Sequence, residues 1–242
     1  MNIIKLNAIP STNDFLKNLC IIQPTENYTV VMAENQTKGK GQRGSTWESE
    51  ANNSLTFSVL TKELLTPENS IFDLNVAVSI SVIEALKEFE IPKLNIKWPN
   101  DILSEEKKIA GILIENSFAG QNISSIIGIG LNVNQTDFDN LPKASSLKNI
   151  TKKEFRKEDI MHNIIEKIKK NNNLIANGKT DFLWQEYHKY LFRKDVPSVF
   201  EYPDSTKFMG IIKEVLRNGK IKISLENNQV REFDLKEIKL IY

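Results

Sequence analysis

The 242-residue sequence contains a single cysteine, Cys20, and only two histidines, His162 and His188. One cysteine excludes an internal disulfide framework and a cysteine-rich zinc site, and fits a reducing compartment. With 10 glycines, 8 prolines and 40% hydrophobic residues, the composition excludes a disordered chain and supports a sizeable core. We therefore expect a cytoplasmic protein of one large or two unequal domains, with chemistry that is not centred on histidine.

Strong net charge and long apolar runs are also missing. The 32 basic and 31 acidic residues nearly cancel, so the surface as a whole has no field that attracts DNA or anionic lipid. The first ten residues lack the apolar core of a signal peptide. No later run approaches the roughly 20 apolar residues that a membrane-spanning helix needs. We expect binding to neither DNA nor membrane.

Hydrophobic periodicity predicts a mixed α and β organisation in the first three quarters of the chain. Ser11 to Asp14 offer side-chain oxygens to a helix start, and the apolar residues that follow predict a short helix ending near Cys20. Ile71–Phe89 fits both strand alternation and helical spacing, and its length favours a helix. Further helices are predicted over 158–176 and 181–191, and strands over 28–33, 53–60, 94–97, 107–116 and 124–133.

After Phe192 the pattern changes to short β-type runs. These cover residues 196–200, 208–216, 221–225, 230–233 and 238–241. The Asn218-Gly219 pair predicts a type I′ hairpin between two of them, because both residue types tolerate positive φ. The sequence therefore predicts a small β-barrel-like C-terminal domain of about 50 residues, a size near the lower limit for independent folding.

A glycine-rich segment, Gly39-Lys40-Gly41-Gln42-Arg43-Gly44, formally matches the dinucleotide-binding pattern G-x-G-x-x-G. That pattern requires a helix directly after the glycines, whereas here a polar segment and then a strand follow. We interpret it as a functional loop whose backbone N–H groups approach a phosphate or carboxylate, with Lys40 and Arg43 as cations. The alternative is a solvated loop with incidental glycines.

The segment Lys97-Trp98-Pro99-Asn100-Asp101 combines a cation, an aromatic ring, a rigid turn and two oxygen-bearing side chains. Asn100 and Asp101 offer the oxygen ligands that suit Mg²⁺, and Lys97 suits a phosphate. An ordinary turn, in which Pro99 sets φ and Asp101 accepts from a nearby N–H, explains the same residues equally well.

Two further segments place polar side chains at the ends of apolar strands. Lys108 precedes a nearly continuous apolar run and can reach a ligand from the mouth of a site. A solvated edge lysine is the commoner explanation of such a position. Asn132 and Asn134 alternate and so face the same side of their strand, for which a sheet-edge turn is the alternative.

Five segments, taken in this order, closely resemble the catalytic domain of biotin–protein ligases. They are Ser11-Thr12-Asn13, Ala33 to Gln36 with the glycine-rich loop through Trp47, Lys97 to Asp101, Lys108 to Gly111, and Gly128 to Asn132. The resemblance covers roughly residues 1–190, and residues 191–242 resemble the SH3-like domain that follows in that family. It implies an α+β fold, a class II synthetase-like mixed sheet packed with helices, followed by a small SH3-like β-barrel.

The resemblance implies a ligase that activates biotin with ATP to biotinyl-5′-AMP, with Mg²⁺. It then transfers biotin to a lysine of a biotin carboxyl carrier protein or domain of a biotin-dependent carboxylase. Because only ten residues precede Ser11, we expect no helix-turn-helix domain and no repressor function. Family members often form homodimers through the central sheet, and Ser124–Val133 is our candidate edge strand.

The resemblance also implies roles for individual residues. Lys108 is the principal catalytic candidate, because its match contacts the biotin carboxylate and the acyl phosphate, and Arg43 is the second. Biotin-binding roles fall on Ser11, Thr12, Asn13, Gln36, Gly39, Lys40, Gly41, Gln42, Lys108 and Gly111. ATP-binding roles fall on Arg43, Trp47, Lys97, Asn100 and Asn132, and a metal-binding role on Asp101. Lys40 and Gln42 replace the arginines of many members, which predicts a less retentive loop.

Other classes of protein remain open. A lipoate or octanoate ligase of the same superfamily also modifies a carrier lysine, but its arginine-rich, triple-glycine and His-Asp segment is not found here. A non-catalytic biotin- or nucleotide-binding protein would tolerate replacement of Lys108, because it has no turnover to lose. An interaction module built on the C-terminal β domain is a third possibility, which fold alone does not decide.

Overall fold

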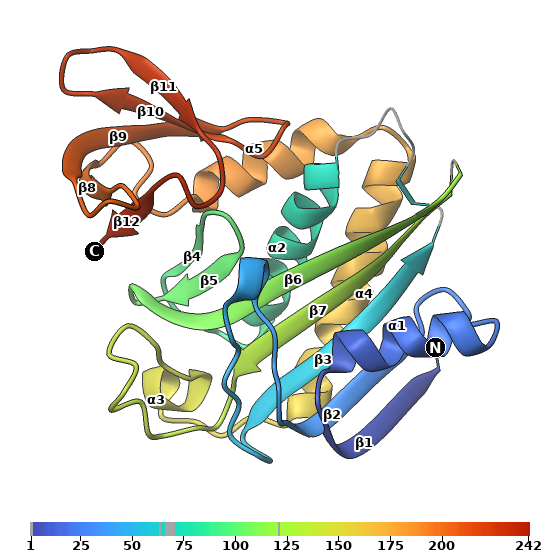
Figure 1. The fold of residues 1–242 in the computed structure, drawn as a ribbon. Helices are drawn as coiled ribbons and strands as arrows, with labels where there is room; N and C mark the ends of the chain where they lie inside the picture. The colour runs from blue at the N-terminus through green and yellow to red at the C-terminus, as the bar shows by residue number, and fades with distance from the viewer. Residues whose placement is uncertain (1, 63, 66–70, 121) are drawn as a thin grey trace.

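The structure, a computed structural model, describes residues 2–62, 64–65, 71–120 and 122–242, apart from the side chains of Arg43 and Asn122. A seven-stranded mixed sheet has the order β1-β2-β3-β7-β6-β5-β4, and a five-stranded antiparallel sheet has the order β11-β10-β9-β8-β12 (Figure 1). In the first sheet β1 runs parallel to β2 and the other neighbours pair antiparallel. The predicted α+β class, a mixed sheet with helices followed by a small β-rich unit, is confirmed.

The first sheet comprises β1 Ile3–Ile9, β2 Val30–Gln36, β3 Ser54–Lys62, β4 Leu94–Lys97, β5 Asp101–Ser104, β6 Lys107–Ala119 and β7 Asn122–Asn132. The helices are α1 Thr12–Ile22, α2 Ile71–Glu88, α3 Leu147–Thr151, α4 Lys157–Ala176 and α5 Thr180–Tyr190, with a 3-10 turn, η1, at Gln42–Gly44. The second sheet comprises β8 Pro197–Glu201, β9 Lys207–Val215, β10 Ile221–Leu225, β11 Val230–Phe233 and β12 Lys239–Ile241. Each predicted element is present within three residues of its expected ends, whereas β1, β5 and α3 were not predicted.

Helices α2 and α4 pack side by side on one face of the central sheet, while α1 covers the opposite face (Figure 1). Thirteen of the 18 residues of α2 are buried, from Asp73 to Leu86. A helix that is buried over most of its surface shows no clean 3.6-residue stripe, which explains why its sequence also fits strand alternation. The described helices include none that is long and apolar enough to cross a membrane.

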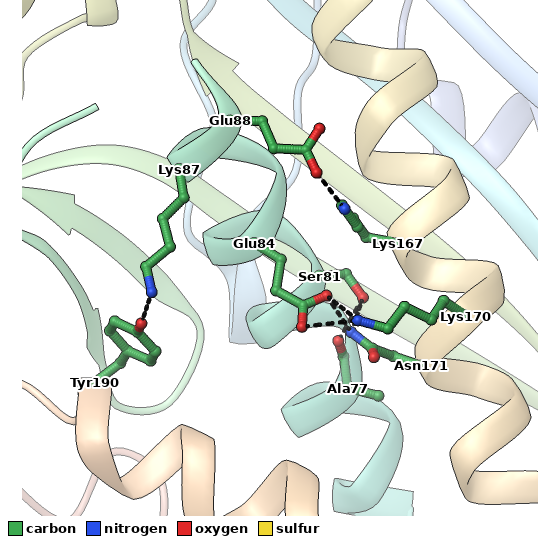
Figure 2. A network of polar contacts seen from close by, with 9 residues as sticks. All are labelled: Ala77, Ser81, Glu84, Lys87, Glu88, Lys167, Lys170, Asn171 and Tyr190. Atoms are coloured by element: carbon green, nitrogen blue, oxygen red, sulfur yellow. Dashed lines mark hydrogen bonds and ion pairs between the residues drawn. The ribbon is translucent and has the colours of Figure 1, made fainter. Parts of the chain in front are cut away.

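Polar contacts tie the exposed edge of α2 to α4 (Figure 2). Glu84 pairs with Lys170 at 3.2 Å, and the buried amide of Asn171 donates to the Ser81 hydroxyl at 3.0 Å. Exposed ion pairs of this kind contribute roughly 0–1 kcal/mol each, so the apolar face of α2 supplies most of the stability of this contact.

Strand β7 lies inside the central sheet, between β3 and β6, so the prediction of an edge strand at Ser124–Val133 is wrong. Nine residue pairs join β3 and β7, from Ser54 opposite Asn132 to Lys62 opposite Ser124. The edges of this sheet are β1 and β4. Alternating hydrophobicity shows that a strand is half-buried but does not identify its neighbours, and this pairing spans more than 60 residues of chain.

The turn between β9 and β10 also differs from the prediction. Gly219 has a φ of 86°, but Asn218 is not among the described residues with positive φ. The N–H of Leu216 donates to the carbonyl of Lys220, which closes a three-residue loop in place of a two-residue type I′ turn. In three-residue hairpin loops the third residue usually adopts the left-handed conformation, and glycine adopts it without steric cost.

Candidate active site

A cavity of about 510 Å³ lies between the central sheet and the second sheet. This volume is within the range of small-molecule and cofactor sites. Most of the predicted site residues line it: Ser11, Thr12, Asn13, Gln36, Lys40, Gly41, Gln42, Trp47, Lys97, Asn100, Asp101, Lys108 and Gly111. Residues that are far apart in sequence therefore line one cavity.

One end of the cavity is formed by the start of α1. Ser11 caps this helix by accepting from the N–H of Asp14 at 3.3 Å, which places Thr12 and Asn13 in the first turn. The backbone N–H of Thr12 donates to Gln36 Oε1 at 2.7 Å, and the Thr12 hydroxyl lies 3.0 Å from the same oxygen. Ser11, Thr12 and Asn13 are each less than 5% exposed. This end therefore carries buried amide and hydroxyl groups in fixed orientations.

The glycine-rich loop folds back on itself between β2 and β3. Lys40 and Thr46 form an antiparallel bridge, and the N–H of Gly41 donates to the Ser45 carbonyl at 2.8 Å. The Lys40 ammonium lies 2.7 Å from the Asp14 carboxylate, and hydrogen bonding to Asp14 raises the pKa of Lys40. The loop is thereby connected to the start of α1 across the mouth of the cavity.

Trp47, at the end of this loop, lies against two glycines of the sheet. A Cβ placed on Gly130 of β7 would overlap the indole, and one on Gly111 of β6 would lie 3.2 Å from it. The indole Nε1 is buried and has no hydrogen-bond partner among the described residues. The Lys108 ammonium lies 5.5 Å from the centre of the Trp47 ring. The Nε1 edge of the ring thus packs against the backbone of β7 at Gly130.

The charged end of the cavity centres on Asp101. Its Oδ1 lies 2.7 Å from the Lys108 ammonium, and its Oδ2 lies 3.3 Å from the Lys97 ammonium. The backbone of Lys108 is held on both sides, since its N–H donates to the Lys143 carbonyl and its carbonyl accepts from Ser145. The two cations are therefore fixed side by side at the cavity wall, where a phosphate or carboxylate can meet both.

The turn between β4 and β5 is held from two directions. Asn100 Nδ2 donates to the Ile112 carbonyl at 2.6 Å, and the Ile112 N–H returns a bond to the Asn100 carbonyl at 3.0 Å. The buried side chain of Asn75, from α2, donates to the Pro99 carbonyl at 2.8 Å. The amide of Asn100 thus fixes the turn that carries Lys97 and Asp101.

Three predicted residues stand apart from the described cavity wall. Asn132 is buried, donates to the Ser145 carbonyl at 3.1 Å and accepts from Gln135 Nε2 at 3.1 Å. Gly39 accepts from the N–H of Trp47 at 3.0 Å, and a Cβ there would overlap the Trp47 backbone. The Arg43 side chain lies outside the described part of the structure, so its predicted catalytic and ATP-binding role stays a prediction.

Asp101 was also the predicted metal ligand. Its two carboxylate oxygens contact Lys108 and Lys97. Within the described residues, no group of three or more His, Cys, Asp or Glu side chains could hold a metal ion. These residues do not fit a resident metal ion, and we derive no chemical step through one.

Sequence reasoning missed several residues that shape the site. Ser58 and Glu115 contact the Asn13 amide from behind, and Gly128 packs directly against it. The second sheet contributes apolar and charged residues to the same cavity, among them Phe200, Glu201, Ile212, Ile221, Lys236 and Lys239. Only the Gly128 segment had a local signal, because it follows the strand-and-glycine pattern that the resemblance included.

The family model described as biotin/lipoate A/B protein ligase matches residues 6–134, which is more than half of the chain. The chain belongs to the biotin/lipoate A/B protein ligase family. The matched part of the chain contains α1, the glycine-rich loop, the β4–β5 turn, Lys108 and β7. It therefore includes both ends of the cavity described above.

Curated relatives of the chain agree with that assignment. The bifunctional ligase/repressor BirA of Bacillus subtilis (strain 168) is 31% identical over 167 residues, which are 66% of this chain and 51% of that protein. The biotin–[acetyl-CoA-carboxylase] ligase of Mycobacterium tuberculosis is 32% identical over 121 residues, which are 49% of this chain and 44% of that protein. The chain thus spans about half the length of the curated relatives it matches.

A solved structure extends the likeness beyond the matched family region. The biotin protein ligase from Aquifex aeolicus, in complex with biotin and ATP, superposes with a TM-score of 0.81 at 28% identity. The superposition covers 99% of this chain and 98% of the Aquifex aeolicus chain. Both sheets, including the C-terminal β8–β12 sheet, are therefore part of the shared architecture.

Proposed function

We propose that this protein is a biotin–protein ligase, which converts biotin and ATP to biotinyl-5′-AMP and then biotinylates a lysine of a carrier protein. One observation carries the proposal: a single cavity joins the buried amides of Asn13 and Gln36 to the Lys108–Asp101–Lys97 cluster. A cyclic urea with a carboxylate tail needs hydrogen-bonding groups at one end and cations at the other.

Biotin is expected to place its ureido ring at the start of α1. The backbone N–H of Thr12 donates to Gln36 Oε1, so Gln36 Nε2 is the atom of that amide that remains for a ligand. The ureido carbonyl needs a donor, and its two N–H groups need acceptors such as the Ser11 hydroxyl and Asn13 Oδ1. Leaving one buried polar group unpaired costs roughly 1–3 kcal/mol, so the site binds a ureido ring in preference to a group without these donors and acceptors.

In the first half-reaction a carboxylate oxygen of biotin attacks the α-phosphorus of ATP, and the bond to pyrophosphate breaks. Negative charge builds on the phosphoryl oxygens, where we place the Lys108 ammonium, with Lys97 beside it. Asp101 holds both cations before substrate arrives, so little reorganisation is needed when charge develops. The Mg²⁺ that accompanies ATP phosphates belongs to the substrate in this proposal.

In the second half-reaction the carrier lysine amine attacks the acyl carbon of the adenylate, the amide bond forms and AMP leaves. Here the protein chiefly positions the reactants and excludes water. We assign Trp47 and the Gly39–Gly44 loop to the nucleotide side. The Trp47 ring lies in the cavity lining near Lys108, and the loop is joined to α1 through the Lys40–Asp14 ion pair.

The carrier that we infer is a biotin carboxyl carrier protein or domain of a biotin-dependent carboxylase. The Mycobacterium tuberculosis relative is named for acetyl-CoA carboxylase, which supports this class of acceptor. We also propose residues 1–190 as the catalytic domain and residues 191–242 as the C-terminal domain. Because residues of the second sheet line the cavity, we expect the C-terminal domain to be required for adenylation.

A lipoate or octanoate ligase of the same family is the second candidate. Its substrate has no cyclic urea, so Gln36 Nε2 and the second lone pair of Asn13 Oδ1 would face an apolar chain without a hydrogen-bonding partner from the ligand. The buried hydrogen bonds at the start of α1 therefore favour biotin.

ATP–pyrophosphate exchange by the purified protein tests the proposal, with biotin, lipoate, octanoate or no acid present. We expect exchange that requires biotin and falls at least 100-fold in Lys108→Ala, about the loss that follows removal of one charge-stabilising donor. Exchange with lipoate or octanoate alone would assign the second candidate. No exchange with any acid would leave a binding protein, and unchanged exchange in Lys108→Ala would remove that residue from the mechanism.

A further inference from the structure

Behind the wall at the start of α1 lies a second layer of polar residues that do not themselves line the cavity. Ser58, in the middle of β3, is fully buried, and its hydroxyl lies 2.6 Å from Asn13 Oδ1 and 2.7 Å from the Thr12 hydroxyl. Glu115, in β6, accepts from Asn13 Nδ2 at 2.8 Å. Polar groups placed in otherwise apolar strands require partners, and here the partners are residues of the cavity wall.

The chemistry of these groups allows only one orientation of the Asn13 amide. Glu115 Oε2 and the Leu113 carbonyl can only accept, so the atom facing them is the amide nitrogen. On the other side, Ser58 has one hydroxyl hydrogen and Asn13 Oδ1 has none, so Ser58 donates to Asn13. A flipped amide could still donate to the Ser58 hydroxyl, but its oxygen would then face Glu115 Oε2 and the Leu113 carbonyl, which have no hydrogen to donate. Asn13 therefore presents an oxygen, with one lone pair still free, in a fixed place.

The strand beside Asn13 leaves its amide no room to move. A Cβ on Gly128 would overlap Asn13 Oδ1, so the backbone of β7 packs flat against the amide. The Thr12 hydroxyl contacts both Ser58 and Gln36 Oε1 and carries the same network to the second amide of the wall. Asn13 thus offers a fixed acceptor and Gln36 a fixed donor at one end of one cavity.

We propose that Ser58 and Glu115 are positioning residues that fix this acceptor and thereby make the site select a cyclic urea over an aliphatic acyl chain. The proposal rests on the proposed function and adds its specificity determinants. A cyclic urea offers two N–H donors and one carbonyl in a rigid plane, so a fixed acceptor beside a fixed donor recognises it without reorganisation. An aliphatic acid offers neither and gains nothing from the network.

The test compares Ser58→Ala with Ser125→Ala in ATP–pyrophosphate exchange. Ser125 is a matched control: its buried hydroxyl donates to Asn116 Oδ1 at 2.7 Å on the neighbouring strands, and it does not line the cavity. We expect Ser58→Ala to raise KM for biotin about tenfold, as for the loss of one buried hydrogen bond, with kcat and KM for ATP within about twofold. Ser125→Ala is expected to leave all three constants unchanged.

A second pair of variants keeps the test independent of folding. Glu115→Leu removes the acceptor for Asn13 Nδ2, whereas Glu115→Gln retains an oxygen there. We expect Glu115→Leu to raise KM for biotin by about tenfold or more, and Glu115→Gln to recover most of that loss. Desthiobiotin keeps the cyclic urea and lacks the sulfur. The ratio of variant KM to wild-type KM must therefore be the same for desthiobiotin as for biotin.

The outcomes separate this inference from the proposed function. If the wild type does not exchange with biotin, the proposed function fails and the inference fails with it. If the wild type exchanges but Ser58→Ala matches Ser125→Ala in KM for biotin, only the inference is overturned. A fall in kcat without a change in KM, or a defect with biotin that is absent with desthiobiotin, also overturns it.

Discussion

The indole Nε1 of Trp98 donates a hydrogen bond to the carbonyl oxygen of Gly219 at 2.9 Å. Trp98 belongs to the β4–β5 turn that carries Lys97 and Asp101, and Gly219 closes the β9–β10 hairpin of the second sheet. The ring of Phe72 packs so closely on Gly219 that a Cβ there would overlap it. The hairpin is thus docked directly onto the turn that holds the charged end of the cavity.

Trp98→Phe removes this hydrogen bond and keeps most of the ring volume. We expect the free energy of unfolding to fall by about 1 kcal/mol, with KM for ATP rising several-fold more than KM for biotin. The reason for the second effect is that the turn places Lys97 and Asp101, whereas the ureido end is formed by other elements. Urea denaturation together with exchange kinetics measures both, and an equal rise in the two KM values would contradict the coupling.

How far the sequence predicts this fold depends on whether the signal is local. Caps, periodicity and turn residues are local, so helices such as α1 and α4 were predicted within a few residues of their ends. Strand β5 was missed because four residues between two turns show no periodicity, and β1 because its exposed edge position blurs the alternation. The neighbours of a strand in the sheet depend on long-range contacts, which is why the prediction of β7 as an edge strand was wrong.

The same distinction applies to the site. Residues in unusual local patterns, such as Lys97 to Asp101 and the glycine-rich loop, are identifiable from the amino-acid sequence alone. Ser58 and Glu115 are not, because a serine or a glutamate in a strand acquires meaning only from what lies opposite. The aliphatic residues of the second sheet resemble ordinary core residues, and only the packing of that sheet over the cavity reveals their position.

Asp101→Asn tests the charged end. The change keeps the shape of the side chain but removes the charge that holds Lys108 at 2.7 Å and Lys97 at 3.3 Å. Under the proposed function we expect kcat for exchange to fall roughly 10- to 100-fold, because preorganised charge is lost from the developing phosphoryl oxygens.

A matched control for this variant lies on the same hairpin. Glu105 forms an exposed ion pair with Lys93 at the other end of β4 and β5, and such pairs contribute roughly 0–1 kcal/mol. Glu105→Gln should leave exchange unchanged. Equal effects of the two variants would show that general electrostatics, and not the contact between Asp101 and the two lysines, sets the rate.

Gly130→Ala tests the place of Trp47 over the sheet. The added Cβ would overlap the indole, so we expect the ring to leave its position and become more exposed to solvent. The measurement is intrinsic fluorescence, which should shift to longer wavelength, with an accompanying rise in KM for ATP. In a Trp47→Phe background the same glycine substitution should produce no spectral shift; a shift there would place its origin at Trp98 or Trp184.

Tyr187→Phe is expected to stabilise the protein. The ring of Tyr187 is fully buried among Phe72, Trp184 and His188, and its hydroxyl has no hydrogen-bond partner within the described residues. A desolvated hydroxyl without a partner costs roughly 1–3 kcal/mol, so its removal should raise the free energy of unfolding by about 1 kcal/mol or more at pH 7. Chemical denaturation measures this change, and destabilisation would show that the hydroxyl has a partner.

The same hydroxyl predicts how stability changes in alkali. Burial raises the pKa of Tyr187, and burial together with Asp101 and Glu106 raises the pKa of Tyr242 to about 12. Because both folded values lie above the unfolded value of about 10, the unfolded chain releases these protons first. The contribution of these two groups to the free energy of unfolding is therefore constant below about pH 10 and falls as pH rises above it, by up to about 1.4 kcal/mol per pH unit for each tyrosine. Unfolding titrations above pH 10 should show a smaller slope in Tyr187→Phe than in the wild type, and identical slopes would mean that this hydroxyl does not ionise on unfolding.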